Sequence, residues 1–183
     1  MPNLCMNELK LTHKDPAMIE RAMVAFKNHA LLNEFIPCPQ QLRDTMAGWR
    51  NRREGDPISN YDADLHEFQQ NLNIKYFGYK DWYEWCVANW GTKWDVGCED
   101  DDFVFLQDGV LRLSFDSAWS PPTAAYEAME RLGFEVEAQY YEPGCEFVGE
   151  YKDGVDDCYD LRDCPEHLDR QFRVSDSLAE MGQ

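Results

Sequence analysis

Polar and apolar residues alternate from Asn7 to Thr12, which is the pattern of a β-strand with one buried face. Asp15 and Pro16 follow, and an aspartate before a proline is a common way to begin a helix. Apolar residues then recur at helical spacing, at Ile19, Ala22, Met23, Phe26 and Ala30. The start of the chain therefore predicts a strand followed by a helix.

The middle of the chain predicts two more helices. The pattern from Tyr61 to Leu72 is weakly helical, with three apolar residues on one side, Leu65, Phe68 and Leu72. Asp81 can cap a second helix, and Gly91 offers the left-handed residue that ends it. One side of this helix holds Trp82, Trp85 and Cys86. Large aromatic residues at helical spacing usually pack in a core, and we interpret this stripe in that way.

Two β-hairpins are predicted in the second half of the chain. Strand-like runs at 103–106 and 110–115 flank the dipeptide Asp108-Gly109, which is typical of a tight hairpin turn. A second pair of runs, 134–141 and 145–151, flanks a Glu-Pro-Gly turn. Each pair is expected to form two antiparallel strands.

A helix lies between the hairpins, with Ser120 as its expected N-cap, Gly133 at its end and an apolar face of Ala125, Met129 and Leu132. The resulting order β-α-β-β-α-β predicts an α+β fold, a ferredoxin-like antiparallel sheet with helices on one face. We expect residues 1–151 to form this domain, with a helical and loop segment inserted at about 43–80. Residues 152–183 are expected to be an acidic extension that packs on the domain or trails from it.

The 183-residue chain carries a net charge of -18, and its acidic residues are unevenly distributed. Residues 1–60 hold eight Lys or Arg and seven Asp or Glu, whereas residues 61–183 hold nine and 28. The acid is densest from Glu135 to Asp169, where twelve acidic residues face two basic ones. Such a surface repels nucleic acid and attracts a basic partner. A predicted solvated loop holds the basic cluster Arg50, Arg52 and Arg53.

Seven cysteines without the spacing of a disulfide framework favour reduced thiols and a cytoplasmic location. The N-terminus lacks the basic and apolar regions of a signal peptide. Apolar runs long enough to span a membrane are also absent from the sequence. We therefore expect a cytoplasmic protein that has no membrane partner.

Five segments, taken in order, resemble one protein family. The most specific is Asn-Trp-Gly-Thr-Lys-Trp-Asp at 89–95, and the others lie at 2–9, 35–42, 115–122 and 141–149. Together they resemble the YubB-type, Api-like proteins of phages and conjugative plasmids. The resemblance implies a ferredoxin-like fold and a mobile-element origin, in the cytoplasm of a bacterial host. It implies no biochemical activity, because the family is known to us only as uncharacterised.

We expect the residues of these family-like motifs to maintain the fold. The motif residues are Trp90, Gly91, Lys93, Trp94, Trp119, Pro121 and Gly144. We expect the tryptophans to anchor helix to sheet, and Lys93 to lie over a tryptophan or to pair with Asp95. A contact between Lys93 and a ligand is the alternative.

The sequence contains few candidates for chemistry. Cys158, Cys164 and His167 are weak candidates for a metal site, because their spacing supplies three ligands without a fourth. We expect no metal and no cofactor. Nucleophilic catalysis would need a histidine beside a thiol such as Cys5 or Cys38, and the sequence contains no such signature. No catalytic residue is assigned, and an enzyme or metal-binding protein stays as an alternative.

Ferredoxin-like sheets can also bind RNA on exposed aromatic residues. Four aromatic residues lie on the predicted strands, Phe103, Phe105, Tyr140 and Tyr141. The lysine and arginine neighbours of an RNA-binding sheet are missing, so we expect no direct binding of nucleic acid.

These observations favour a non-enzymatic binding protein of a mobile element. Its acidic face would occupy the basic nucleic-acid-binding surface of a host or defence protein, as an anti-restriction or anti-CRISPR inhibitor does. The residues expected on that face are Glu99, Asp100, Asp101, Asp102, Glu146, Glu150, Asp153, Asp156, Asp157, Asp160 and Asp163. The alternative is an accessory module in plasmid or phage replication or transfer, for which a homo-oligomer would be typical.

Overall fold

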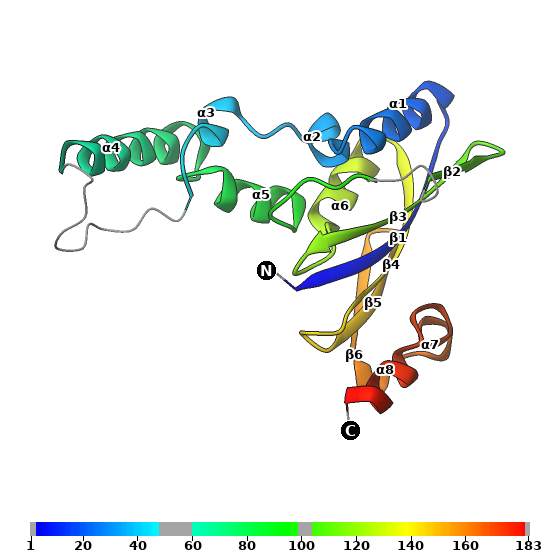
Figure 1. Ribbon diagram of the computed structural model, residues 1–183. Helices are drawn as coiled ribbons and strands as arrows, with labels where there is room; N and C mark the ends of the chain where they lie inside the picture. Colours follow the sequence, from blue (N-terminus) through cyan, green and yellow to red (C-terminus); the bar gives the residue numbers. More distant parts are fainter. Residues whose placement is uncertain (1–2, 48–59, 99–103, 182–183) are drawn as a thin grey trace.

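Six antiparallel strands form one sheet in the computed structural model of the protein, in the order β2-β3-β1-β4-β5-β6 (Figure 1). The structure describes residues 3–47, 60–98 and 104–181. The strands are β1 (Leu4–His13), β2 (Val104–Gln107), β3 (Val110–Ala118), β4 (Phe134–Glu142), β5 (Phe147–Lys152) and β6 (Val155–Asp160).

The first four strands have the predicted ferredoxin-like arrangement. β3 lies between β1 and β2, and β4 pairs with the other side of β1, so each β-α-β connection is split by an intervening strand. The two crossover helices are α1 (Pro16–Lys27) and α6 (Thr123–Arg131). β5 and β6 extend this sheet beyond β4. The α+β fold is confirmed.

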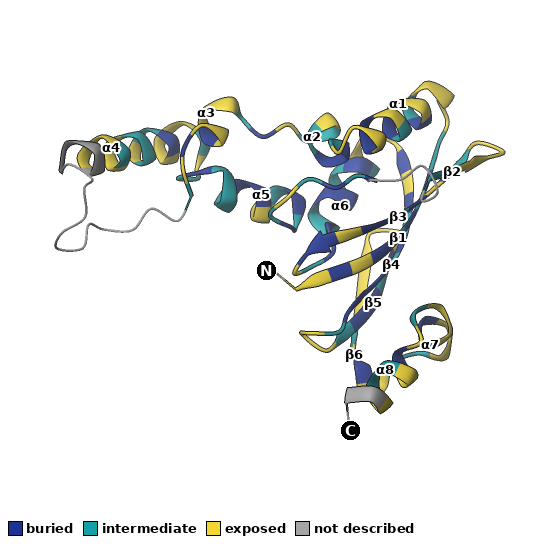
Figure 2. Cartoon of the chain, in the orientation of Figure 1, coloured by how far each residue is buried: buried dark blue, intermediate teal, exposed yellow. Residues whose placement is uncertain are grey.

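The main core lies between one face of the sheet and a layer of helices, which includes α1, α6, α2 (Leu31–Phe35) and α5 (Trp82–Trp90) (Figure 2). β1 alternates as predicted, and Leu9 and Leu11 point into this core while their neighbours point to the other face. From α1, Phe26 is fully buried and its ring lies 5.8 Å from that of Phe115. Apolar burial on this face therefore fixes the register of the central strands.

Local signals set the ends of several elements where the sequence predicts them. The Asp15 carboxylate accepts a hydrogen bond of 2.9 Å from the Ala17 N–H at the start of α1. Asp81 accepts one of 3.1 Å from the Glu84 N–H at the start of α5, which ends at Gly91 with φ +88°. Asp108 and Gly109 both have positive φ, as a two-residue hairpin turn requires.

Three sequence-based expectations about helix ends are wrong. Pro122, and not Ser120, is the N-cap residue of α6, and the Ser120 hydroxyl donates instead to the Gly91 carbonyl at 2.6 Å. A residue before a proline is kept out of the helical region, so the two prolines delay the helix to Thr123. Leu132 and Ala30 lie beyond the ends of α6 and α1, and Leu132 is exposed.

The short helix α3 (Gln40–Arg43) comes before the inserted segment, which contains α4 (Asn60–Phe77). α4 is the helix expected from Tyr61 onwards, although it is longer than predicted, and it projects away from the sheet (Figure 1). The cluster Arg50, Arg52 and Arg53 lies outside the described residues.

The C-terminal segment adds helices to the ferredoxin-like part. A short 3-10 helix (Leu161–Asp163), α7 (Glu166–Phe172) and α8 (Val174–Met181) follow β6. They pack on the face of the sheet opposite the main core, in a second apolar cluster of Tyr141, Val148, Leu161, Leu168 and Val174. The expectation of helices on one face therefore holds for the ferredoxin-like part and not for this segment.

Candidate functional site

Exposed carboxylates gather on the β5–β6 hairpin and on the turns before and after it. We define the acidic edge as Glu146, Asp153, Asp156, Asp157, Asp160 and Asp163, all of which are exposed. Glu150 lies on the same hairpin and is half-buried. Glu99, Asp100, Asp101 and Asp102 lie outside the described residues. The structure thus brings together the acids of the C-terminal part of the predicted face.

The geometry of the acidic edge follows from the strand that carries most of it. β6 pairs only with β5 in the sheet, so its outer side is an open edge. Successive side chains of a strand point to opposite faces, so Asp157 lies on one face of the sheet while Asp156 and Asp160 lie on the other. Carboxylates therefore project on both sides of one exposed strand.

Two acids of the edge also have structural partners. The Asp156 carboxylate accepts a hydrogen bond of 2.6 Å from the Tyr140 hydroxyl. Burial and the nearby Asp156 charge raise the pKa of Tyr140 far above its usual value, so the phenol stays a neutral donor. Asp160 accepts a hydrogen bond from the Arg162 N–H at 3.0 Å. Among the described residues, no lysine or arginine forms an ion pair with an acid of the acidic edge.

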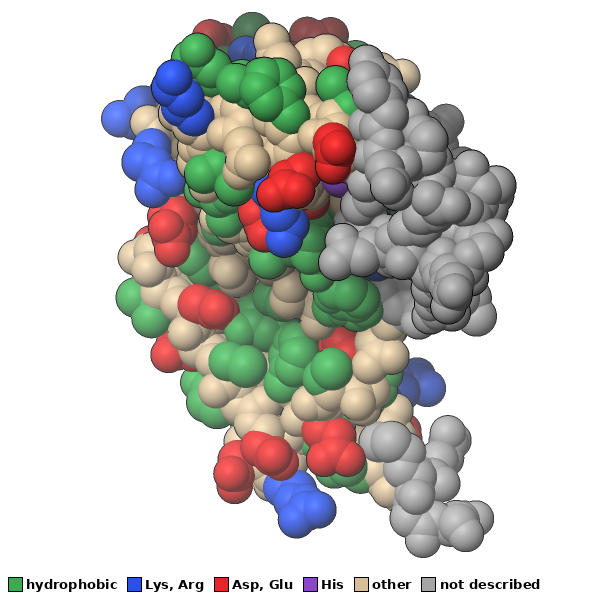
Figure 3. All heavy atoms as spheres, turned by 90° about the vertical axis from the view of Figure 1, so that its left-hand side faces the viewer, with side chains coloured by type: hydrophobic (Ala, Val, Ile, Leu, Met, Phe, Trp, Pro, Cys, Tyr) green, Lys and Arg blue, Asp and Glu red, His purple; other side chains and the backbone are tan. Residues whose placement is uncertain are grey.

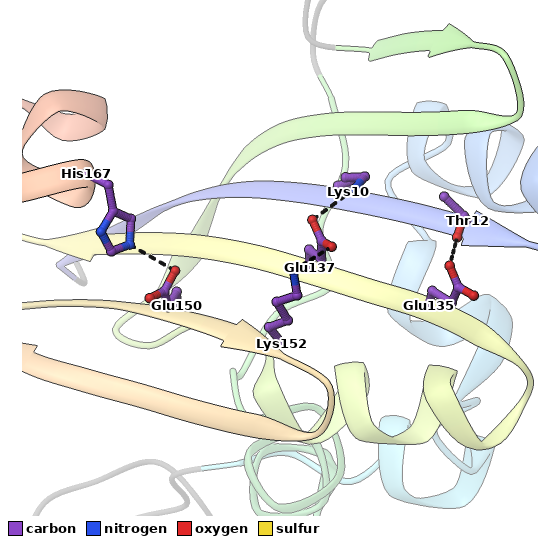
Figure 4. A network of polar contacts seen from close by, with 7 residues as sticks. All are labelled: Lys10, Thr12, Glu135, Glu137, Glu150, Lys152 and His167. Carbon is purple, nitrogen blue, oxygen red and sulfur yellow. Dashed lines mark hydrogen bonds and ion pairs between the residues drawn. The ribbon is translucent and has the colours of Figure 1, made fainter. Parts of the chain in front are cut away.

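On the face of the sheet opposite the main core, several charged side chains are paired (Figure 4). Glu137 receives the Lys10 ammonium at 2.9 Å and the Lys152 ammonium at 3.1 Å, and these contacts lower the pKa of its carboxyl group. The His167 imidazole, from α7, lies 3.0 Å from the Glu150 carboxylate. Charges of both signs thus lie along a hollow of about 390 Å³.

A larger hollow of about 770 Å³ lies over the same face, between β1, β3 and the end of α7. Leu4, Met6 and Phe172 supply apolar walls, while Glu8 and Asp116 supply carboxylates. Desolvation raises the pKa of Asp116. The hollow is also lined by His29 and, from the segment that follows α5, by Asp95 and Cys98.

Lys93 lies between two tryptophans of the family-like motifs. Its ammonium nitrogen is 4.0 Å from the centre of the Trp94 ring system and 4.2 Å from that of Trp119. Trp94 and Trp119 are 46% and 43% exposed, so these two do not anchor helix to sheet as expected. Trp90 does, since it is buried and donates its indole N–H to the Ile36 carbonyl at 2.9 Å.

Asp95 does not pair with Lys93. Its two carboxylate oxygens accept hydrogen bonds of 2.7 to 3.0 Å from the N–H groups of Leu32, Asn33 and Val96. It therefore fixes the start of α2 to the segment that follows α5.

Two buried thiols, those of Cys5 and Cys38, are poor nucleophiles. Desolvation raises the pKa of Cys5 to about 12 and also raises that of Cys38. Both thiols therefore stay protonated at neutral pH, whereas nucleophilic catalysis needs a thiolate.

The weak metal candidates are not brought together. Cys158 is on the β6 face that carries Asp156, whereas His167 contacts Glu150 on the opposite face. Across 3–47, 60–98 and 104–181, no three His, Cys, Asp or Glu side chains are placed to hold one metal ion.

Two of the aromatic residues that could have stacked on RNA are buried. Tyr140 and Tyr141 are each 1% exposed, Tyr141 beneath the Phe172 ring of α7. Phe105 is exposed, and Phe103 lies outside the described residues. Tyr140 and Tyr141 lie on a strand as predicted, but both side chains are buried.

Figure 3 shows how side-chain types are distributed on the face that carries the N-terminus. Hydrophobic side chains gather in its middle, and acidic side chains are spread around them and near its lower end. Acidic side chains therefore do not form one continuous patch on this face.

Comparisons with known proteins give one structural likeness. Neither a family model nor a curated protein matches the chain. The crystal structure of protein api92 from Yersinia pseudotuberculosis, described with the family model DUF1281, is similar with a TM-score of 0.45 and 11% sequence identity. The match covers 90% of this chain and 100% of that one. The chain is thus similar to an Api protein, at a level that carries no conclusion about site or function.

In the described part of the chain, none of the helices combines the length and the apolar character needed to cross a lipid bilayer.

Proposed function

We propose that this protein is a non-enzymatic binding protein that uses the acidic edge to engage a basic surface of another protein. The observation that supports this proposal is the gathering of six exposed carboxylates on and beside one open strand. On the face of the sheet opposite the main core, by contrast, Lys10 and Lys152 both pair with the Glu137 carboxylate. The acidic edge is therefore the part of the described surface best suited to attract positive charge.

The charge of the whole chain strengthens the attraction. A net charge of -18 creates a long-range field that steers a basic partner towards the protein, and that repels DNA and RNA. Basic surfaces on proteins are most often nucleic-acid-binding sites. Because the sequence resembles proteins of phages and conjugative plasmids, the most concrete partner is a restriction or CRISPR nuclease of the bacterial host.

A second candidate is an accessory module in the replication or transfer machinery of a mobile element. It is favoured by the half-exposed Trp94 and Trp119 on either side of Lys93, because tryptophan is enriched at the centres of protein interfaces.

The first proposal can be tested by displacement of DNA from a purified nuclease. Fluorescent duplex DNA is bound to restriction enzymes or CRISPR effectors in 50 mM NaCl, and this protein is titrated in. We expect it to release the DNA from at least one of them, and to lose this activity at 500 mM NaCl because salt screens the interaction. If no nuclease of the panel releases DNA, the inhibitor proposal is wrong.

A matched pair of variants locates the surface. The edge variant carries Asp153→Asn, Asp157→Asn and Asp163→Asn, which avoids the structural acids Asp156 and Asp160. The control variant loses the same charge at three exposed acids elsewhere, Glu20→Gln, Asp44→Asn and Asp108→Asn. We expect about tenfold weaker displacement by the edge variant than by the control variant. Equal losses would show that only total charge matters.

A further inference from the structure

α4 carries an apolar stripe that no other described part of the chain covers. Leu65, Phe68 and Tyr76 are 53%, 59% and 69% exposed, and Leu72 between them is partly exposed. The helix projects away from the sheet, and much of its length is coloured as exposed (Figures 1 and 2). Large apolar side chains of a surface helix normally face a core, so an exposed row of them indicates a binding surface.

The four residues form one continuous row. Their spacings of three, four and four residues return to the same side of a helix with 3.6 residues per turn. The row is about 16 Å long, given a rise of 1.5 Å per residue. Ile74 is also 50% exposed, but it lies on the opposite side of α4. The helix therefore offers one apolar side and a separate apolar residue for comparison.

The base of α4 is fixed to the rest of the molecule by Asn73, which is buried. Its amide nitrogen donates to the Thr45 hydroxyl at 2.8 Å and to the Lys80 carbonyl at 2.9 Å. Its amide oxygen accepts a hydrogen bond of 2.9 Å from Gln69. Because buried hydrogen bonds of this kind are costly to break, the stripe is presented on a helix that is held in place.

We propose that the stripe binds the same stripe of a second copy of this chain, with the two α4 helices antiparallel. The row is close to symmetric about a point between Phe68 and Leu72. Antiparallel pairing about that point sets Leu65 of one copy against Tyr76 of the other, and Phe68 against Leu72. Every apolar residue of the row then has an apolar partner, as helix packing requires.

Charges beside the stripe fit the antiparallel arrangement and not the parallel one. Asp64 and Lys75 lie on the same flank of the row, near its two ends. In an antiparallel pair, Asp64 of each copy comes next to Lys75 of the other. In a parallel pair, this flank of each copy would lie on the opposite side of the interface from the same flank of the other, so the two charges would not meet. The opposed helix dipoles also favour antiparallel packing.

The size of the stripe sets the expected strength of the dimer. Four side chains from each copy form an interface below the usual size of a stable complex. We therefore expect a dissociation constant on the order of 10 to 100 µM. The inference does not depend on the proposed function, because α4 and the acidic edge are separate parts of the surface.

The oligomeric state of the full chain provides the first test. Light scattering and sedimentation in 150 mM NaCl should show a monomer at about 2 µM and mainly dimer at about 300 µM. Phe68→Glu should raise the dissociation constant at least about 20-fold, because it places a charge in the centre of the interface. The matched control Ile74→Glu adds the same charge to the same helix on its other side, and should leave dimerisation unchanged. Circular dichroism would verify that both variants are folded.

Charge reversal tests the orientation of the helices. Asp64→Lys and Lys75→Asp, each alone, should weaken the dimer about tenfold, because each creates two like-charged pairs. The double variant restores opposite charges in an antiparallel pair and should dimerise as the unaltered chain does.

Several results would overturn the inference. One is a chain that stays monomeric at 300 µM. Another is a dimer that Phe68→Glu and Ile74→Glu weaken equally, since the stripe would then not be its interface. A third is a double charge reversal that fails to restore the dimer, because the antiparallel arrangement would then be wrong.

Discussion

Trp119 combines a large side chain with a left-handed backbone conformation, φ +71°. Residues with a Cβ atom are disfavoured there by about 1 to 2 kcal/mol, and a bulky residue is a clear outlier. The surroundings hold it in place, since the Trp119 N–H donates to the Asn3 carbonyl at 2.9 Å and its ring lies beside Lys93. The exposed indole is thus kept at the surface at the cost of backbone strain, which is typical of binding sites.

Glycine and alanine at position 119 should differ in a way that reports this strain. We expect the free energy of unfolding of Trp119→Gly to exceed that of Trp119→Ala by about 1 kcal/mol, because glycine alone adopts positive φ without strain. Trp94 is the control, since its φ is not positive. There the order should reverse, with Trp94→Gly less stable than Trp94→Ala. The free energies of unfolding of both pairs can be measured by urea denaturation, with circular dichroism as the signal. If Trp119→Ala were more stable than Trp119→Gly, the backbone at position 119 would not be strained.

At the scale of elements, Glu137 links three strands. Its carboxylate on β4 receives Lys10 from β1 and Lys152 from β5 (Figure 4). The two ammonium groups favour the ionised carboxylate and lower the pKa of Glu137 in the folded protein. Charge pairing therefore links three neighbouring strands on the face of the sheet opposite the main core.

This network predicts a pH-dependent contribution to stability. Because the folded pKa of Glu137 lies below its unfolded value of about 4.3, the contribution is present above that pH and is lost as the pH falls through the folded pKa. Glu137→Gln should be less stable than the unaltered protein at pH 7, and the difference should vanish towards pH 3. Urea denaturation between pH 7 and pH 3 measures it. The control is Glu20→Gln, at an exposed position of α1, for which we expect little difference in stability at any pH. If Glu137→Gln were less stable than the unaltered protein by the same amount at every pH, the loss would come from packing and not from charge.

At the scale of the whole molecule, the charge imbalance acts against folding as well as towards partners. A net charge of -18 makes the folded chain repel itself, and the exposed acids around the β5–β6 hairpin concentrate this repulsion. The same feature that would steer a basic partner therefore lowers stability in the absence of that partner.

Salt should stabilise the free protein for this reason. Raising NaCl from 50 to 500 mM shortens the screening length to a few ångströms, so we expect the melting temperature to rise by several degrees. The edge variant should show a smaller rise than the control variant, because its remaining acids are further apart. Differential scanning calorimetry measures all three proteins. A melting temperature that falls with salt would mean that attractive ion pairs outweigh the repulsion.

The sequence by itself determined the elements of the ferredoxin-like part. Alternation in β1, the caps Asp15 and Asp81 and the Asp108-Gly109 turn are all decided by neighbouring residues, so a local pattern is enough to find them. Strand β6 could not be found in this way. It is an edge strand with little apolar alternation, and it exists because β5 supplies its hydrogen-bond partners.

Only the tertiary structure decided which side chains are available to a partner. Tyr140 and Tyr141 are buried, whereas Trp94, Trp119 and the stripe of α4 are exposed, although all of these positions hold large aromatic or aliphatic side chains. Exposure depends on what distant segments cover, as the C-terminal helices cover Tyr141 and leave the acidic edge open. Charge, in contrast, was readable from the sequence because composition alone fixes it, and the fold decided only that the acids of the hairpin meet on one edge.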